Sequence, residues 1–467
     1  MAAVQVMAPA LPSRQRRSAA VIVVGAGLSG LQAAHHIQSS GSSCLLLEAT
    51  DCVGGRFAQG PGRHGFDGAR HVRMAELARR LGLGVESPQA RQGEEDTAQG
   101  LGACGADGIP EGFTADDRRA LIRVRTNVEA LCQRVDVNRP AELMPNYGTM
   151  TVRELVASQG GTAAVQHLAN SWTLTLFGLG CHRVSALYFL VHCKCGGGLL
   201  QTLSDLAGGS QNLRVSGGVS RLCEELVARL QPGSVLLSQH VDRIDQTPGN
   251  RCVLTTRSGE VFQCAKVILA GAASQCRTID FAPDLGADKQ WLRDPAHAGF
   301  SRSMILLFDQ PWWRERGFSG RAQALDGPMC MVLDSSSDDA DTLSALTCLV
   351  AGESGQELWL KPEDDRRQDV LRNLEAIFGE KVPFPAGVME LGPETDTLAC
   401  LAVPAAHLRD LERDHWRPEG SIFFAGSAAS FVSRGHPEGA LAAGSRASEE
   451  VVCALQPTLG AGPVPRL

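Results

Sequence analysis

Hydrophobic positions along the 467 residues follow two spacings, which predict strands and helices in turn. Short continuous apolar runs are typical of strands buried in a sheet, and apolar residues three and four apart are typical of one helix face. The runs predict strands at 21–24, 44–47, 235–237, 241–244, 252–256, 266–270, 304–308 and 421–425. The helical spacing predicts helices at 31–37, 74–83, 116–131, 151–168, 222–230, 363–378 and 435–455. Strands that alternate with helices in this way indicate an α/β fold.

The first strand runs directly into a glycine-rich turn. The turn reads Gly25-Ala26-Gly27-Leu28-Ser29-Gly30 and opens the first helix, whose free N–H groups can face a pyrophosphate. Glu48 follows Gly25 by 23 residues and ends the second strand, where a carboxylate can accept hydrogen bonds from ribose hydroxyls. The pair of features predicts a dinucleotide site. The alternative is an ordinary strand-turn-helix unit with an incidental surface glutamate.

The chain continues from Glu48 through Ala49 into the turn Gly54-Gly55-Arg56. With this continuation the sequence resembles the flavin-containing amine oxidase family, whose flavin fingerprint runs on into a Gly-Gly-Arg turn. The resemblance implies FAD rather than a nicotinamide dinucleotide. It also implies that backbone N–H groups of the turn, together with Arg56, face the diphosphate.

Further motifs occur in the order of the family. The resemblance implies that the turn Asp67-Gly68-Ala69 lies close to the flavin ring and that the backbone of Val241 pairs with adenine, although Val241 also fits an ordinary strand. A second cofactor element near the C-terminus would aim a helix N-terminus at the flavin, with a capped surface helix as the alternative. The residues carried over for this element are Gly426, Ser427, Glu438, Gly439 and Ala440.

The resemblance also implies a domain organisation. A Rossmann-like FAD-binding domain is expected at 19–86, 206–279 and 391–456, interleaved with a mixed α+β substrate domain at 87–205 and 280–390. Residues 1–18 are expected to form a disordered extension, and residues 457–467 form a C-terminal tail. A chain of this length exceeds one ordinary hydrophobic core, which agrees with two domains.

Composition and charge narrow the range of partners. A net charge of −7 and a pI near 6.0 give no reason to expect nucleic acid or an anionic membrane, so a small-molecule substrate is expected, with dioxygen from the resemblance. Fifteen cysteines are scattered without zinc-type spacing, and no metal is expected. No window is apolar enough for a membrane anchor. The sequence leaves open whether the chain forms a homodimer.

The last three residues have the form of a variant peroxisomal address. They read Pro465-Arg466-Leu467, so a cytoplasmic and a peroxisomal location both stay open.

The catalytic positions depart from the family pattern. The family's lysine near flavin N5 falls at Ser303, beside Arg302, and only one of these neighbours on a strand can face the flavin. The family has an aromatic residue shortly before its Glu-Gly pair, and His436 occupies that position in this chain. His436 fits either a general base that titrates near neutrality or a hydrogen-bonded turn histidine. Ser303, Arg302 and His436 are therefore the catalytic candidates.

Some members of the family attach the flavin covalently through a cysteine. Cys400, which precedes a Val-Pro turn, lies at a comparable distance along the sequence before Gly426. The flanking residues of those members do not follow, so non-covalent FAD is expected. The sequence thus predicts an FAD-dependent oxidoreductase that takes a hydride from an amine and passes the electrons to dioxygen, giving hydrogen peroxide. An oxidase or desaturase acting on a non-amine biosynthetic intermediate and a catalytically weakened flavin-binding homologue are the alternatives.

Overall fold

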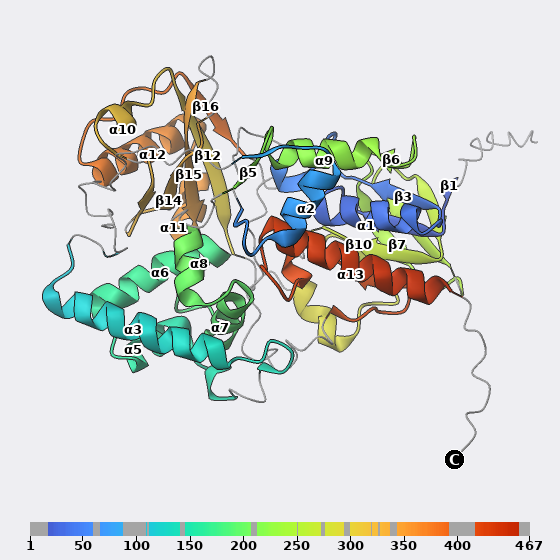
Figure 1. The fold of residues 1–467 in the computed structure, drawn as a ribbon, viewed down its shortest axis with the longest axis horizontal. Coiled ribbons are helices and arrows are strands. Elements are labelled where there is room, and N and C mark those ends of the chain that lie inside the picture. Colours follow the sequence, from blue (N-terminus) through green and yellow to red (C-terminus); the bar gives the residue numbers. More distant parts are fainter. Residues whose placement is uncertain are drawn as a thin grey trace, which may run out of the picture.

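The computed structural model describes residues 17–58, 66–86, 109, 112–140, 145–206, 213–249, 251–271, 276–293, 299–318, 320–325, 327–336, 343–391 and 416–456. Three regions carry most of the regular structure: a parallel sheet with its helices, a group of helices, and an antiparallel sheet with its own helices (Figure 1). Cys400 and the C-terminal tripeptide lie outside the described residues.

The parallel sheet is built from five strands of the described chain in the order β17-β10-β2-β3-β6. Their bounds are β2 Val21–Val24, β3 Cys44–Leu47, β6 Val235–Leu236, β10 Lys266–Leu269 and β17 Ile422–Phe424. Val21, Ile22 and Val23 in the middle strand are fully buried, as expected for a parallel strand that is covered on both faces. This is the doubly covered sheet that the apolar runs predict.

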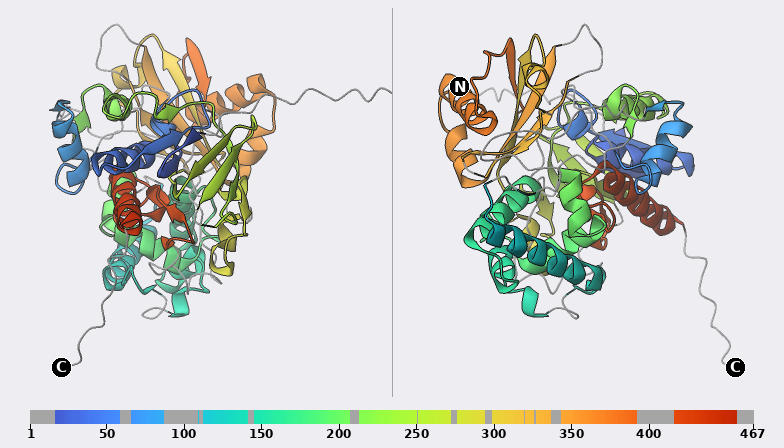
Figure 2. Two further views of the ribbon diagram at one scale, coloured as in Figure 1. Left: turned by 90° about the vertical axis from the view of Figure 1, so that its right-hand side faces the viewer. Right: turned by 60° about the vertical axis from the view of Figure 1, so that its left-hand side comes forward.

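Helices cover one face of the parallel sheet. They are α1 Leu28–Ser39, α2 Val72–Arg80, α9 Gly218–Ala228 and α13 Pro437–Leu455. Val21 and Val23 pack on this side with Leu31 of α1 and Leu441 of α13. The first and last long helices of the chain lie side by side, which the views of Figure 2 show from other directions.

A mixed sheet covers the other face, where Ile22 and Val24 pack with Phe262 and Leu254. Its order is β1-β9-β8-β7-β11, with β1 Arg17–Ser18, β7 Val241–Asp245, β8 Cys252–Thr256, β9 Val261–Cys264 and β11 Asp280–Ala282. The expectation that the disordered extension reaches residue 18 is wrong. Arg17 and Ser18 pair with β9, because its outer edge offers free backbone groups.

The group of helices follows strands β2 and β3 of the parallel sheet along the chain. Its bounds are α3 Ala115–Arg134, α5 Val152–Ser158, α6 Ala163–Phe177, α7 Ala186–Cys195 and α8 Leu199–Leu206. The single helix predicted at 151–168 is interrupted at Gly160 and Gly161, where the chain turns with φ +79° at Gly160. Thr162 then caps α6 by accepting a hydrogen bond from the Val165 N–H.

The third region is an antiparallel sheet in the order β13-β14-β15-β12-β16. Its strands are β12 Ser301–Phe308, β13 Ala322–Gln323, β14 Met329–Asp334, β15 Ser344–Ala351 and β16 Gly387–Glu390, and its helices are α10 Trp312–Glu315, α11 Gly352–Trp359 and α12 Glu363–Phe378. A further short pair joins β4 Val85–Glu86 to β5 Arg214–Val215, and 3₁₀ turns occupy Gly55–Phe57, Pro145–Tyr147, Ala287–Arg293 and Ser427–Ala429.

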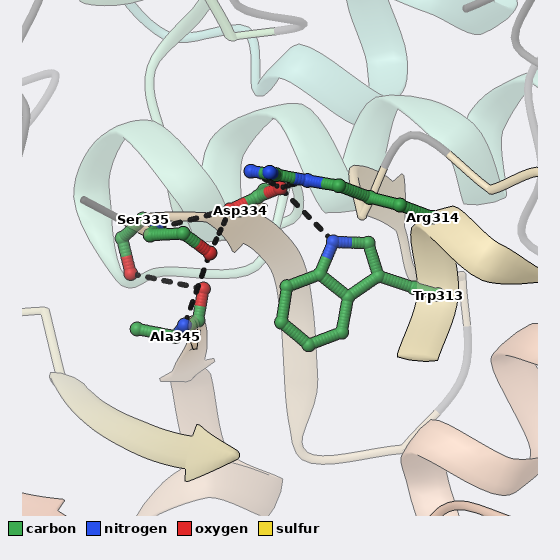
Figure 3. Close-up of polar contacts among 6 residues, drawn as sticks. Trp313, Arg314, Asp334, Ser335 and Ala345 are labelled. Atoms are coloured by element: carbon green, nitrogen blue, oxygen red, sulfur yellow. Dashed lines mark hydrogen bonds and ion pairs between the residues drawn. The ribbon is translucent and has the colours of Figure 1, made fainter. Parts of the chain in front are cut away.

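Asp334 joins α10 to the antiparallel sheet. Its Oδ2 accepts hydrogen bonds from Trp313 Nε1 at 2.9 Å and from Arg314 at 2.8 and 2.6 Å (Figure 3). Burial alone would raise the pKa of Asp334, but hydrogen bonds from Ser336, Trp313 and Arg314 outweigh it and lower the pKa. The carboxylate therefore stays charged and stabilises this corner of the sheet.

None of the helices in the described part of the chain is both long enough and apolar enough to cross a lipid bilayer.

Candidate functional site

The glycine-rich turn leaves open space at the start of α1. Gly25 has φ +104°, a conformation that favours glycine, and a Cβ at Gly30 would lie 1.9 Å from the Gly25 carbonyl oxygen. A Cβ at Gly27, in contrast, would meet nothing within 4 Å. The turn is therefore closed where helix and strand pack, and open in front of the helix N-terminus, where an anion binds most favourably.

Glu48 lies at the end of β3 and is 8% exposed. Its Oε2 accepts a hydrogen bond from the Ala26 N–H at 2.6 Å, and its Oε1 accepts from the Thr50 N–H and hydroxyl at 2.9 Å each. Oε1 uses both of its lone pairs in these bonds, whereas Oε2 keeps a second lone pair that can accept from a ribose hydroxyl. The protein thus holds this carboxylate against the glycine-rich turn.

A pocket lies between the ends of β2, β3 and β7. It contains the predicted residues Gly25, Ala49 and Val241, and its other lining residues are Val24, Leu47, Gln239, His240, Thr278 and Ile279. The Oε1 atom of Gln239 is buried here without a hydrogen-bond partner. An apolar pocket with an unsatisfied amide oxygen fits a planar base that carries an amino group. Gln239 follows a short strand and carries no motif that would have identified it.

The Gly-Gly-Arg turn lies against the glycine-rich turn. Gly54 has φ +107°, and a Cβ at Gly55 would lie 3.3 Å from the Gly27 Cα. Arg56 reaches the C-terminal element, where its guanidinium donates to the Gly435 carbonyl at 2.9 Å and to the Ser427 hydroxyl at 2.8 Å. One positive charge therefore joins the two loops that were predicted to hold the cofactor.

The C-terminal element packs directly on the N-terminal one. Gly426 has φ +92° and donates its N–H to the Ser29 hydroxyl at 2.8 Å. A Cβ at Gly439 would lie 2.4 Å from the Ser433 carbonyl oxygen, so glycine lets the loop lie against the start of α13. Leu28 and Ala440 are buried in the apolar cluster between the sheet and its helices. The structure brings these predicted residues together around the N-termini of α1 and α13.

The side chain of Glu438 forms hydrogen bonds with the start of α2. It is 2% exposed, and its carboxylate accepts hydrogen bonds from the backbone N–H groups of Arg73 at 3.2 Å and Met74 at 2.9 Å. These are among the N–H groups at the start of a helix that have no partner within the helix. The side chain of Glu438 therefore positions α2 against α13, and the place of Glu438 in the cofactor element stays a prediction.

The Asp67 side chain forms hydrogen bonds within its own turn. Its carboxylate accepts from the Ala69 N–H at 2.8 Å and from Arg70 Nε at 2.7 Å, close to Gly68 in the same turn. Burial would raise the pKa of Asp67, but the hydrogen bonds from Arg70 and Ala69 outweigh it and lower the pKa. Arg70 continues to the Gly196 carbonyl at 2.6 Å and so connects this turn to the end of α7.

His436 lies directly before α13, with its ring 5.8 Å from that of His71. Burial lowers the pKa of His436 to about 4, and the positive charges of Arg56 and Arg70 add to this effect. A histidine with this pKa is neutral at pH 7, which argues against the alternative of a general base that titrates near neutrality, while a catalytic role of His436 stays a prediction. The ring can still accept or donate a hydrogen bond as a neutral imidazole.

The two candidates on β12 face opposite sides of the antiparallel sheet. Arg302 shares a face with Met304 and Leu306, which belong to the apolar cluster under α10 and α12, and its guanidinium lies 5.2 Å from the Phe300 ring. Ser303 is 6% exposed and lies on the other face. Only one of the two can therefore take the place of the family's lysine, and the burial of Ser303 away from the α10 and α12 cluster favours Ser303.

Two buried residues near His436 were missed by sequence reasoning. His192 lies in α7 and Arg434 lies in the loop before α13, and both are 5% exposed. Neither belongs to a motif, and nothing in the spacing of the chain signals that a histidine at 192 meets a loop more than two hundred residues later. Among the described residues, no group of three or more His, Cys, Asp or Glu side chains could hold a metal ion.

Comparisons with known proteins agree with this arrangement. Residues 147–452 match the family model for flavin containing amine oxidoreductase, and residues 23–81 match a model for an NAD(P)-binding Rossmann-like domain. The chain is 26% identical over 452 residues to amine oxidase [flavin-containing] B of Cavia porcellus, covering 93% of this chain and 86% of that protein. It is 28% identical over 450 residues to a putative flavin-containing monoamine oxidase of Mycobacterium tuberculosis, covering 93% and 97%.

Solved structures share the fold. The cyclohexylamine oxidase of Brevibacterium oxydans superposes with a TM-score of 0.80 at 22% identity, covering 94% of this chain and 100% of that one. A putrescine oxidase bound to putrescine gives a TM-score of 0.78 at 20% identity with the same coverage. The predicted fold, a Rossmann-like cofactor region combined with mixed α and β elements, is confirmed.

Proposed function

Because the chain belongs to the flavin containing amine oxidoreductase family, we propose that this FAD-dependent enzyme oxidises a small-molecule amine with dioxygen as the final acceptor. When bound, FAD would supply the redox chemistry, namely acceptance of a hydride from the carbon next to the amine nitrogen and transfer of the electrons to dioxygen to give hydrogen peroxide. The observation that carries the proposal is the open space at Gly27 in front of α1, joined through Gly55 and Arg56 to the start of α13.

The residues around this space fit the parts of FAD. Gln239 and Val241 would hold the adenine, and Glu48 would accept hydrogen bonds from the ribose. The N–H groups at the start of α1 and the guanidinium of Arg56 would hold the diphosphate. The N-terminus of α13, with Gly426, Ser427, Gly439 and Ala440 beside it, would lie next to the flavin ring and favour negative charge there.

The same charges favour a reactive substrate. An amine must be neutral to lose a hydride from the carbon next to nitrogen, because a protonated nitrogen withdraws the electrons that the reaction needs. Arg56 and Arg70 lower the pKa of His436, and they would lower the pKa of an ammonium group bound beside His436 in the same way. Ser303, on the face of β12 opposite Arg302, stands where the family has its lysine, and its hydroxyl would hold a water molecule there.

The test is anaerobic mixing of the FAD-loaded protein with a panel of primary and secondary amines, followed in the flavin absorbance near 450 nm. We expect at least one amine to bleach the flavin, and admission of air to restore the colour with one peroxide per amine. Purified protein that stays colourless with excess FAD would refute the cofactor site. Yellow protein that no amine bleaches would refute amine oxidation.

A second candidate is oxidation of a non-amine donor. It is favoured by His436 and Ser303, which replace the aromatic residue and the lysine of the family pattern. A panel of alcohols and α-hydroxy carbonyl compounds in the same assay distinguishes the two, since only the second candidate predicts bleaching by these donors and silence with every amine.

A further inference from the structure

Arg434 is a buried cation without a counter-ion. It is 5% exposed, and its Nε donates to the Ser430 carbonyl at 3.0 Å. Its two terminal amino groups have no acceptor, and no carboxylate pairs with it, anywhere in the part of the chain that the structure describes. Lys289, the other cation buried to this degree, lies 3.6 Å from Glu419. An unpaired charge in a protein interior is costly, which points to a negatively charged ligand at Arg434.

His192 lies beside this cation. The Nδ1 atom of His192 is fully buried without a hydrogen-bond partner, which costs free energy unless a ligand supplies the bond. The ring is held edge-on by Phe177, with centroids 4.9 Å apart. Burial lowers the pKa of His192 to about 3, and the charge of Arg434, together with that of His436 once protonated, adds to the effect, so the ring is a neutral hydrogen-bonding group.

The position of both residues connects them to the catalytic region. A Cβ at Gly435 would lie 3.9 Å from the Cε1 atom of His192, so the turn that precedes His436 lies directly over this imidazole. The Ser433 N–H donates to the Cys195 carbonyl at 2.8 Å and fixes the loop to the end of α7. Arg56 reaches the Gly435 carbonyl from the other side. The unpaired groups thus lie against the loop that leads into His436 and the start of α13.

We propose that Arg434 and His192 bind a carboxylate of the substrate, so that the preferred substrate is an amino acid or another amine that carries a carboxylate. The proposal rests on the proposed function, because it names the substrate class of the same site. A guanidinium offers two parallel donors that match a carboxylate, and a neutral imidazole adds one hydrogen bond without adding charge. The single positive charge of Arg434 is then balanced by the single negative charge of the carboxylate, because His192 is neutral.

The experiment compares amines with and without a carboxylate. The FAD-loaded wild type and the variants Arg434→Met, Arg434→Lys and His192→Leu are assayed with phenethylamine against phenylalanine, and with pentylamine against 6-aminohexanoate. Loss of a charged hydrogen bond of about 1.5–3 kcal/mol corresponds to roughly 10- to 100-fold in affinity. We expect Arg434→Met to lower kcat/KM by this factor for the carboxylate-bearing member of a pair and to change the plain amine little, with partial rescue in Arg434→Lys.

Binding of benzoate provides a readout without turnover. Titration calorimetry is expected to show benzoate bound by the wild type, weakened by the same factor in Arg434→Met, and unchanged in the control Arg372→Met, whose side chain is 69% exposed on α12. A wild type that prefers the plain amines and does not bind benzoate would overturn the inference and leave amine oxidation standing. Benzoate binding that depends on Arg434, without oxidation of any amine, would support the carboxylate site and overturn the proposed function.

A third outcome concerns the cofactor itself. If Arg434→Met shifts the reduction potential of the bound FAD and leaves benzoate binding unchanged, then Arg434 serves the flavin ring and the inference is wrong. Folding of each variant is checked by its thermal midpoint before these comparisons are made.

Discussion

The Gly426 N–H donates a hydrogen bond to the Ser29 hydroxyl across 397 residues of sequence. Ser29 belongs to the first turn of α1, and Gly426 follows β17 in the loop that leads to α13, so this bond joins the N-terminus of α1 to that loop. Gly444 continues the contact, since a Cβ there would lie 2.3 Å from the Ser29 carbonyl oxygen. The cofactor region therefore depends on the close packing of α1 against α13, and its glycines have two separable roles.

Substitution of two glycines in the same turn should separate these roles. Gly27→Ala places a methyl group where the protein has nothing within 4 Å, so the apo protein should keep its thermal midpoint while FAD affinity falls about tenfold or more. Gly30→Ala places a Cβ 1.9 Å from the Gly25 carbonyl oxygen, so the fold itself should be destabilised. Differential scanning fluorimetry with and without FAD measures both. Equal effects of the two variants on the apo protein would contradict the assignment of Gly27 to the cofactor.

Glu438→Ala should destabilise the junction between α13 and α2. The carboxylate accepts from two backbone N–H groups at the start of α2, and their loss leaves buried donors without partners, at a cost of about 1–3 kcal/mol. Urea unfolding measures the free energy. The matched control is Glu450→Ala in the same helix, where an ion pair with Arg446 is partly exposed and its loss should cost less than about 1 kcal/mol. Similar losses in both variants would show that Glu438 does not hold α2.

Asp334→Ala should destabilise the antiparallel sheet more than loss of a surface ion pair. Removal of this carboxylate leaves Arg314 and the indole N–H of Trp313 without their shared acceptor. We expect the free energy of unfolding to fall by about 3 kcal/mol. Asp280→Ala is the control, because its pair with Arg243 is largely exposed and is expected to contribute about 0–1 kcal/mol. Guanidinium unfolding followed by the fluorescence of the six tryptophans, which include Trp313, measures the midpoint and the free energy. An unchanged midpoint in Asp334→Ala would refute the role given to this cluster.

Much of the fold could be predicted from sequence because local patterns determine it. The helix predicted at 363–378 is α12, and the strand at 252–256 is β8, since both are bounded by residues that end regular structure. The break at Gly160 and the pairing of Arg17 with β9 were not predicted, because a turn inside a continuous apolar pattern and an edge contact across the chain leave no periodic signal.

The cofactor turns could be predicted for the same reason, whereas the catalytic region could not. Gly25 and Gly54 meet a conformational requirement and Gly30 a packing requirement, and the motif in the sequence signals all three. The environment of His436 depends on Arg56 and Arg70, which arrive from distant segments and lower its pKa. The pairing of His192 with Arg434 is likewise tertiary, and no spacing rule connects a residue in α7 to the loop before α13.

Stability should fall as the pH is lowered from about 6.5 to 4. His192 and His436 have pKa values lowered to about 3 and about 4 by burial, whereas in the unfolded chain they titrate near 6.5. Below pH 6.5 the unfolded state therefore binds more protons than the folded state. Each histidine then reduces the unfolding free energy by up to about 1.4 kcal/mol per pH unit. Unfolding curves of the wild type and of His192→Leu at pH 7, 6, 5 and 4.5 measure this, and the variant should show the smaller slope. Equal slopes would contradict a neutral, buried His192.

Arg434→Met should stabilise the apo protein while it impairs the enzyme. Arg434 is 5% exposed and has no anionic partner among the described residues, so its burial opposes folding, whereas methionine fills a similar volume without charge. Even a buried ion pair can be replaced by well-packed apolar side chains with no loss, or with a gain of about 1–4 kcal/mol, and an unpaired charge has less to lose. We therefore expect a higher thermal midpoint and a larger unfolding free energy for Arg434→Met than for the wild type in the absence of ligand. Benzoate should raise the midpoint of the wild type and not that of the variant. A lower midpoint for the ligand-free variant would mean that the guanidinium already has a stabilising partner, and that Arg434 is retained for the fold and not for a substrate.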